Sequence, residues 1–122
     1  MALIMVADDD PVILAMIRGH LESLGHQVVT VSDGMQAAEK AQDWRPHLII
    51  TDIQMPNAYG TTAYEVLQRS AATVGVPVIF ISGVPEALAQ KLLPKAVGVR
   101  FLPKPLDLVR LDALVRELLP RA

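Results

Sequence analysis

The sequence predicts an α/β fold: a doubly wound, five-stranded parallel sheet with five helices in a three-layer sandwich. Short β-branched or aliphatic runs alternate with longer segments of helical periodicity along all 122 residues. Most of these runs are apolar on both faces, as is typical of strands that are covered from both sides. Because strict alternation of strand and helix gives parallel pairing through right-handed crossovers, we expect an open sheet with helices on each face.

Helix-capping and helix-ending residues support the predicted elements. The expected strands are Leu3–Ala7, Val28–Val31, Leu48–Ile50, Val78–Ile81 and Val99–Leu102. The expected helices are Pro11–Leu24, Gly34–Asp43, Thr61–Ala71, Glu86–Leu93 and Leu108–Leu119. The first helix is the clearest, because Asp10 is a good N-cap, Pro11 suits the first helical position and Gly25 is a stop signal. Asp33 and Asp107 precede the second and fifth helices in the same way.

Length and composition narrow the class of protein. The length is that of one compact domain, expected to span residues 1–122. Eleven Lys and Arg against 13 Asp and Glu give a net charge of -2, so we expect no nucleic-acid partner and no attachment to an anionic membrane. The absence of Cys excludes a disulfide scaffold and a thiolate site. The first apolar run, Met1–Ala7, ends in three Asp residues and lacks the features of a signal peptide, so we expect a cytoplasmic protein.

Reactive side chains follow the predicted strands. In open α/β sheets, ligands bind beyond the carboxyl ends of the strands. The residues at these ends are Asp8, Asp9 and Asp10 after the first strand, Asp52 after the third, Ser82 after the fourth and Lys104 after the fifth. If the first and third strands are neighbours, Asp8, Asp9 and Asp52 converge, and their charges repel unless a cation neutralises them.

A hard divalent cation and a phosphoryl group suit such an edge. Mg²⁺ prefers oxygen ligands and often takes one or two carboxylates together with a phosphate. An ionised Asp can attack phosphorus to give an aspartyl phosphate when a metal and a cation screen the charge. Lys104 and Ser82 are placed to contact the phosphoryl oxygens. The pattern therefore indicates phosphoryl chemistry at the carboxyl edge of the sheet.

Four segments resemble the receiver domain of two-component response regulators. They are Ile4–Pro11, Leu48–Pro56 with Gly60 after it, Ser82–Gly83 and Phe101–Pro105. The resemblance spans nearly the whole chain. The run Asp52-Ile53-Gln54-Met55-Pro56 is moderately specific alone and highly specific in combination with the upstream acidic cluster and the downstream Lys-Pro pair.

The resemblance implies a role for each residue at the site. Asp52 would be the phosphoacceptor, and Asp8 and Asp9 would hold Mg²⁺ together with Asp52, with Asp9 the direct ligand of the acidic pair. Gln54 would offer its backbone carbonyl to the metal. Lys104 would pair with the phosphoryl group. The family also implies a strand order of 2-1-3-4-5.

The resemblance further implies a switch and two partners. Ser82 would be the switch hydroxyl, Phe101 would be an aromatic that turns inward, and Lys104-Pro105 would be a cis peptide bond. A histidine kinase or a phosphotransfer protein would donate the phosphoryl group. A downstream protein would dock on the face of the fourth helix, fifth strand and fifth helix of a monomer or weak dimer. Such a domain catalyses only its own phosphorylation and dephosphorylation.

Two alternatives remain open at this point. The run from Asp8 to Val12 also fits the nucleophile motif of haloacid dehalogenase-type phosphatases, with Asp8 as nucleophile and Asp10 as general acid/base. That hypothesis leaves Asp52 without a role and lacks a paired acidic motif after Lys104. The second alternative is a pseudo-receiver that acts without phosphorylation. Asp10 before Pro11 is better interpreted as a helix N-cap than as a metal ligand.

Other residues have structural interpretations. The three His residues, at positions 20, 26 and 47, show no metal-ligand spacing and are expected to be structural or surface residues. The sequence does not decide whether the apolar residues Leu88, Leu92, Leu93 and Val97 face the core or a dimer partner.

Overall fold

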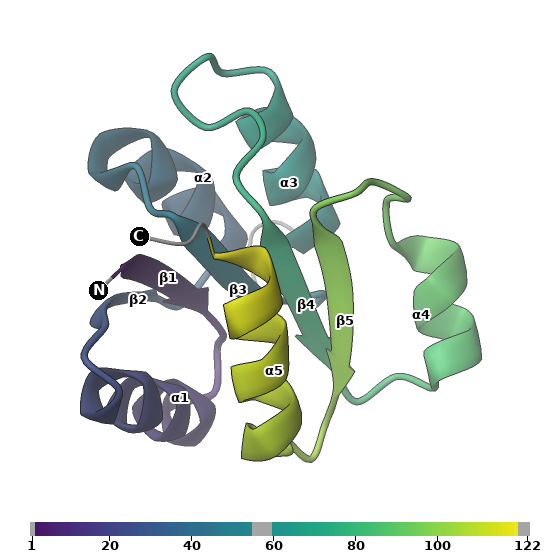
Figure 1. Ribbon diagram of the computed structural model, residues 1–122. Helices are drawn as coiled ribbons and strands as arrows, with labels where there is room; N and C mark the ends of the chain where they lie inside the picture. The colour runs from purple at the N-terminus through teal and green to yellow at the C-terminus, as the bar shows by residue number, and fades with distance from the viewer. Residues whose placement is uncertain (1, 55–59, 120–122) are drawn as a thin grey trace.

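The described residues, 2–54 and 60–119 of a computed structural model, form one five-stranded parallel sheet in the order β2-β1-β3-β4-β5 (Figure 1). The strands are β1 (Leu3–Ala7), β2 (Gln27–Val31), β3 (Leu48–Asp52), β4 (Val78–Ser82) and β5 (Val99–Pro103). This confirms the predicted fold class and strand order. The first strand has the predicted bounds, and the others are longer by one or two residues.

Five helices connect and follow these strands. They are α1 (Pro11–Ser23), α2 (Gly34–Trp44), α3 (Gly60–Gln68), α4 (Glu86–Leu92) and α5 (Leu108–Leu118). Three of them begin at a capping carboxylate, because Asp10, Asp33 and Asp107 each accept a hydrogen bond from a backbone N–H two or three residues ahead, at 2.8–2.9 Å. Gly25, with a φ of 93°, follows the end of α1, as predicted from its freedom to adopt a left-handed conformation.

The third helix is shorter than predicted. The periodicity suggested Thr61–Ala71, but α3 ends at Gln68. The hydroxyl of the buried Thr73 donates a hydrogen bond of 2.7 Å to the carbonyl of Leu67, in the last turn of the helix. This bond satisfies a carbonyl that a longer helix would use itself, so the chain turns away toward β4.

The apolar core lies in two layers, one on each face of the sheet. On one face, Ile17 and Leu21 of α1 and Leu111 and Val115 of α5 pack on the strands. On the other face, α2, α3 and α4 contribute Ala37, Ala41, Leu67 and Ala89. Figure 1 shows α1 and α5 together in front of the sheet and α2 and α3 behind it. Because the central strands β1, β3 and β4 are buried on both faces, the sheet is a rigid platform for the residues at its edge.

The His residues have structural contacts. His20 of α1 lies 2.6 Å from Asp112 of α5 and joins the two helices. The Nδ1 atoms of His26 and His47 accept hydrogen bonds from the backbone N–H groups of Ala2 and Leu3, at the start of β1. These contacts fit the structural interpretation. Within the described ranges, no helix combines the length and apolar character that crossing a bilayer requires.

Strand register brings the predicted site together. Ala7 of β1 pairs with Thr51 of β3. Asp8 and Asp52 come directly after these two paired residues, so they lie next to each other at the ends of neighbouring strands. Across β3 and β4, Asp52 pairs with Ile81, and Ser82 then pairs with Pro103 of β5. Four strand ends therefore deliver the site residues to one edge of the sheet.

Candidate functional site

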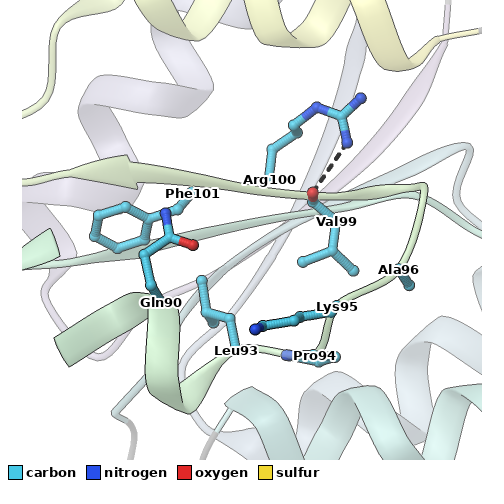
Figure 2. Close-up of a pocket in the computed structure, with 8 residues that line it drawn as sticks. All are labelled: Gln90, Leu93, Pro94, Lys95, Ala96, Val99, Arg100 and Phe101. Carbon is cyan, nitrogen blue, oxygen red and sulfur yellow. Dashed lines mark hydrogen bonds between the residues drawn. The ribbon is translucent and has the colours of Figure 1, made fainter. Parts of the chain in front are cut away.

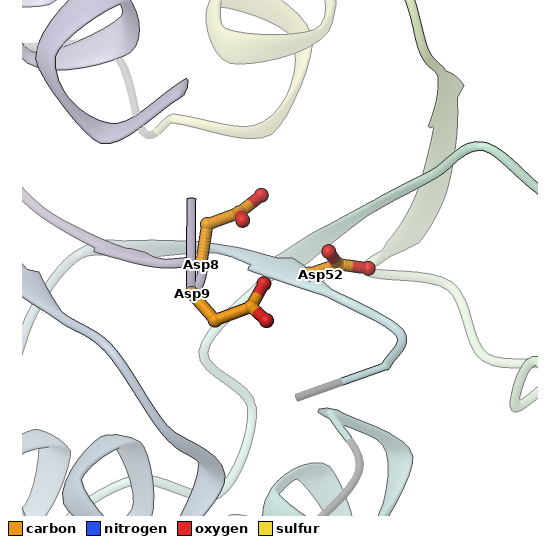
Figure 3. A group of neighbouring side chains, drawn as sticks. All are labelled: Asp8, Asp9 and Asp52. Atoms are coloured by element: carbon orange, nitrogen blue, oxygen red, sulfur yellow. The ribbon is translucent and has the colours of Figure 1, made fainter. Parts of the chain in front are cut away.

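Three carboxylates meet beyond the ends of β1 and β3 (Figure 3). Asp8, Asp9 and Asp52 each offer one oxygen, and these oxygens all lie within 4.8 Å of one another. Asp8 is fully buried and Asp52 is 7% exposed, whereas Asp9 is exposed to solvent. Carboxylates at this separation repel one another strongly when all are ionised, so the cluster requires positive charge.

Lys104 supplies one positive charge from the end of β5. Its Nζ lies 2.9 Å from Asp52 Oδ2 and 3.1 Å from Asp8 Oδ2. The backbone N–H of Lys104 donates to the carbonyl of Ser82 at 2.9 Å, which fixes the end of β5 against the end of β4. The peptide bond between Lys104 and Pro105 is cis, as the family resemblance implied.

The strand-end side chains are held by local turns of one kind. Asp8 Oδ1 accepts from the N–H of Asp10 at 2.9 Å, and Asp52 Oδ1 accepts from the N–H of Gln54 at 3.1 Å. The hydroxyl of Ser82 accepts from the N–H of Val84, also at 3.1 Å. In each case a side chain that ends a strand binds the amide two residues ahead, in the manner of an Asx or Ser turn. These bonds orient one oxygen of each carboxylate and leave the other toward the site.

These amides were missed in the sequence interpretation, which assigned roles to side chains and one carbonyl. A signal was present, because Asp and Ser directly after a strand commonly bind the amide two positions on. The same geometry settles the interpretation of Asp10. The Asp10 side chain accepts a hydrogen bond from the N–H of Val12 and is the N-cap of α1. The backbone N–H of Asp10 donates to Asp8 Oδ1.

Burial and charge move two pKa values at the site. Burial raises the pKa of the Asp8 carboxyl above its usual value, although the N–H of Asp10 and the Lys104 ammonium oppose this shift. Burial alone would lower the pKa of Lys104, but the carboxylates of Asp52 and Asp8 outweigh it and hold that pKa above its usual value. Lys104 is therefore charged at neutral pH, whereas keeping Asp8 ionised in the folded protein costs free energy.

The donor set fits a hard divalent cation. Asp8 Oδ2 is buried and accepts no hydrogen bond of acceptable geometry from the described residues, although Lys104 Nζ lies close enough for an ion pair. A buried carboxylate oxygen without a hydrogen bond is costly unless a cation binds it. Two further carboxylates lie beside it, and oxygen ligands of this kind are those Mg²⁺ prefers.

The remaining predicted residues lie at the border of this cluster. Gln54 is exposed, and its N–H contacts Asp52. Ser82 is buried, with its hydroxyl turned to Val84. Phe101 of β5 packs against the core beside α4, away from the carboxylates. The Met55 and Pro56 part of the motif lies outside the described residues.

We predict that Asp8→Asn stabilises the metal-free protein at neutral pH. Because the folded state raises the pKa of Asp8, it binds this proton more tightly than the unfolded chain does, and the ionised carboxylate costs stability as pH rises through the raised pKa. The gain of the variant should be largest near pH 7 and vanish toward the ordinary pKa of Asp, about 3.9. Urea unfolding in EDTA across this range measures it.

The matched control for this prediction is Asp43→Asn, which removes an exposed carboxylate in α2 and changes the net charge equally. The control should show no comparable gain. An Asp8→Asn variant that is less stable than wild type at pH 7 would contradict the electrostatic description of the site.

Comparison with known proteins identifies relatives over the whole chain. The family model described as the response regulator receiver domain matches residues 4–116. Protein PilH of Pseudomonas aeruginosa is 32% identical over 108 residues, which cover 88% of each chain. The transcriptional regulator RpaA of Synechocystis is 31% identical over 97% of this chain, but the chain spans only 49% of that protein. The chain therefore spans nearly all of some curated relatives and about half of others.

Solved structures agree with the sequence relatives. The chemotaxis response regulator CheY4 of Vibrio cholerae has a TM-score of 0.88 at 28% identity, covering 98% of this chain and 99% of that one. The receiver domain of the sensor histidine kinase PA1611 from P. aeruginosa has a TM-score of 0.87 at 25% identity, covering 96% of each chain, and that structure has a magnesium ion coordinated in its active site cleft. With the matching strand order and the acidic cluster at the strand ends, these findings show that the chain belongs to the response regulator receiver domain family.

Proposed function

We propose that Asp52 accepts a phosphoryl group from a histidine kinase or a histidine phosphotransfer protein, with Mg²⁺ bound beside it. The observation that carries this proposal is the pairing of Asp52 with Lys104 at 2.9 Å inside a cluster of three carboxylates. A carboxylate held this way is a nucleophile with a fixed cation on one oxygen. Membership in the receiver family supports the same assignment.

The transfer is a displacement at phosphorus. A carboxylate oxygen of Asp52 forms the new P–O bond while the P–N bond to the donor imidazole breaks, and the bond electrons leave with the imidazole. Lys104 stabilises the added negative charge on the phosphoryl oxygens. The N–H of Gln54 keeps the Asp52 carboxylate oriented throughout. This chemistry modifies the domain itself, so we propose a signalling role and not that of an enzyme with an external substrate.

Asp8, Asp9 and Asp52 are the proposed Mg²⁺ ligands, with the backbone carbonyl of Gln54. Asp9 is the exposed member of the acidic pair and therefore the residue that can turn to the ion at least cost, which supports its role as the direct ligand. When bound, the ion would neutralise the clustered carboxylates and the incoming phosphoryl oxygens. The magnesium ion described for the PA1611 receiver supports this choice of cation.

The switch residues are Ser82 and Phe101 in this proposal. Ser82 ends β4, and its hydroxyl is bound to the N–H of Val84, a contact that it would exchange for a phosphoryl oxygen. Phe101 lies on β5 beside a cavity next to α4, so an inward turn of its ring would change that surface. Phosphorylation would thereby favour one conformer of the face of α4, β5 and α5, where a downstream protein docks.

The proposed setting is a single receiver domain over residues 1–122, acting in the cytoplasm as a monomer or weak dimer. The phosphatase alternative is disfavoured, because the Asp10 side chain that it needs as general acid already caps α1. The pseudo-receiver alternative predicts that Asp52 takes up no phosphoryl group.

Intact mass after incubation with Mg²⁺ and acetyl phosphate tests the proposal. Wild type should gain one base-labile phosphoryl group, and peptide mapping should place it on Asp52. Asp52→Asn should gain none because the nucleophile is gone, while its far-ultraviolet circular dichroism stays that of wild type. An adduct mapped to Asp8 with turnover of the donor would favour the phosphatase, and no adduct together with no Mg²⁺ binding would favour the pseudo-receiver.

A second prediction distinguishes the role of Asp9 from that of Lys104. Asp9→Ala should lose most of the Mg²⁺ affinity, because it removes a ligand oxygen. Lys104→Ala should keep the Mg²⁺ affinity within about tenfold of wild type, a change of no more than about 1.4 kcal/mol. On phosphorylation, however, Lys104→Ala should lack the amide shifts at Ser82 and Phe101 that wild type shows by NMR. Equal losses of Mg²⁺ affinity in the two variants would contradict these roles.

A further inference from the structure

We infer that His26 and His47 form a pH-sensitive clamp on the first residues of β1, closed while both imidazoles are neutral and opened when they are protonated. His26 lies directly before β2 and His47 directly before β3, and β1 lies between these two strands. The inference does not depend on the proposed phosphoryl chemistry. It is carried by four hydrogen bonds to the backbone of Ala2 and Leu3.

His47 binds Leu3 at two points. The N–H of Leu3 donates to His47 Nδ1 at 3.0 Å, and the N–H of His47 donates to the carbonyl of Leu3 at 2.8 Å. Both polar backbone groups of Leu3 are therefore satisfied on the side of β3, one of them by a side chain.

His26 holds Ala2 in the same way on the side of β2. The N–H of Ala2 donates to His26 Nδ1 at 3.3 Å, and the N–H of Gln27 donates to the carbonyl of Ala2 at 2.9 Å. The backbone of two successive residues is thus bound to the two neighbouring strands in turn, with an imidazole on each side.

Each imidazole takes the place of a backbone carbonyl. In a regular parallel ladder, the N–H of Leu3 would bind the carbonyl of Arg45. The N–H of Ala2 would bind that of Gly25 in the same way. Arg45 and Gly25, however, lie at the ends of α2 and α1 with positive φ angles, 49° and 93°, so the chain has not yet entered the strand there. The imidazoles supply the acceptors that the helix ends do not.

An imidazole can do this only while it is neutral. A neutral imidazole has one N–H and one nitrogen that accepts a hydrogen bond, so an accepting Nδ1 places the proton on Nε2. A protonated imidazole has an N–H on both nitrogens and accepts none. The closed clamp and the imidazolium ion therefore exclude one another.

The surroundings of His26 disfavour its charged form. Burial, and next the positive charge of the N-terminal amino group, hold the pKa of His26 below its usual value. Asp112 of α5 has the opposite effect, but its carboxylate is bound to His20 at 2.6 Å. Glu22 of α1 lines the same groove as His26 and forms its ion pair with Arg18.

His47 is exposed and likewise has no acidic partner. None of the described carboxylates forms an ion pair with His47. The charged residues that precede it are Asp43 and Arg45, both exposed at the end of α2. Protonation of His47 therefore removes a hydrogen bond without gaining an ion pair among the described residues.

The clamp loses strength as pH falls. Because folding lowers the pKa of His26, the unfolded chain binds this proton more readily than the folded protein does. The stability that the clamp contributes is fully present above the ordinary pKa of His, about 6.5, and is lost as pH falls below it.

The beginning of β5 is held by a group that does not titrate in this range. The guanidinium of Arg100 donates to the carbonyls of Val97 and Val99 and to Glu117. Figure 2 shows the bond from Arg100 to the carbonyl of Val99. Because an Arg side chain keeps its charge, acid releases the beginning of β1 and leaves that of β5 bound.

The clamped strand is the one that leads to the acidic pair. Asp8 and Asp9 directly follow Ala7, the last residue of β1. An open clamp frees the first residues of β1 from both neighbouring strands, which favours local opening of the strand that supports the candidate metal site. The clamp thereby makes the support of this site dependent on pH.

NMR of the wild-type protein in EDTA is the first test. At about pH 7.5, the imidazoles of His26 and His47 should both carry their proton on Nε2. As pH is lowered to about 5, the amide signals of Ala2 and Leu3 should move with the same midpoints as the imidazole signals of His26 and His47, respectively. His20→Asn, which removes an imidazole that binds Asp112, should keep both responses.

Two double variants provide the second test. His26→Asn/His47→Asn places an amide oxygen near each Nδ1 position, so the clamp can close but cannot titrate. Between about pH 7.5 and pH 5, the unfolding equilibrium constant of wild type should rise about tenfold more than that of this variant. His26→Gln/His47→Gln places its oxygens near the Nε2 positions, so it should be less stable than the Asn variant already at about pH 7.5.

Three results would overturn the inference. The first is a proton on Nδ1 of His26 and His47 at neutral pH. The second is a pair of amide signals at Ala2 and Leu3 that do not follow the two imidazoles. The third is an equal dependence of stability on pH in wild type and in the Asn variant. The first two are measured on wild type, so they decide the matter even if a variant does not fold.

Discussion

The repulsion among three carboxylates at one edge of the sheet is the constraint around which this domain is organised. Asp8, Asp9 and Asp52 are held within 4.8 Å of one another, and Lys104 offsets only part of their charge. Neutral hydrogen-bonded residues at the same positions would spare the fold this cost. Clustered carboxylates of this kind favour a bound divalent cation, so the cost that they impose on the fold is consistent with the proposed Mg²⁺ and phosphoryl chemistry.

Rigid strands make this arrangement possible. Asp8 and Asp52 each directly follow or end a strand that is buried on both faces, and local amide hydrogen bonds fix one oxygen of each side chain. Asp8 and Asp52 therefore cannot move their carboxylates apart without disturbing the sheet. The same sheet continues into β4 and β5, which carry Ser82 and Lys104 at their ends. A change of charge at Asp52 therefore acts directly beside Ser82 and Lys104, and Phe101 lies on the same strand that leads to Lys104.

Much of the fold and the identity of the site side chains could be predicted from the sequence. Alternating apolar runs and helical segments predicted the sheet, and capping residues such as Asp10 and Asp107 predicted where helices begin. The predicted length of α3 was wrong, because the end of the helix depends on a hydrogen bond from the Thr73 hydroxyl to the Leu67 carbonyl, six residues earlier, that hydrophobic periodicity does not reveal. The residues that converge at the site were predicted because parallel strands deliver their ends to one edge.

Other features depend on three-dimensional packing and were beyond sequence patterns. The apolar residues of α4 and of the loop after it divide in a way that spacing did not predict, since Leu93 packs on the core while Leu88, Leu92 and Val97 are exposed.

The most direct test of this account is the dependence of the free energy of unfolding on Mg²⁺ concentration. Because the ion should bind the folded cluster and not the unfolded chain, the unfolding free energy of wild type should rise with the logarithm of the Mg²⁺ concentration above its dissociation constant. Asp9→Asn should flatten this dependence, while Asp10→Asn, which changes a helix cap outside the proposed ligand set, should keep it. A wild-type stability that does not respond to Mg²⁺, or the same response in Asp9→Asn, would contradict the account.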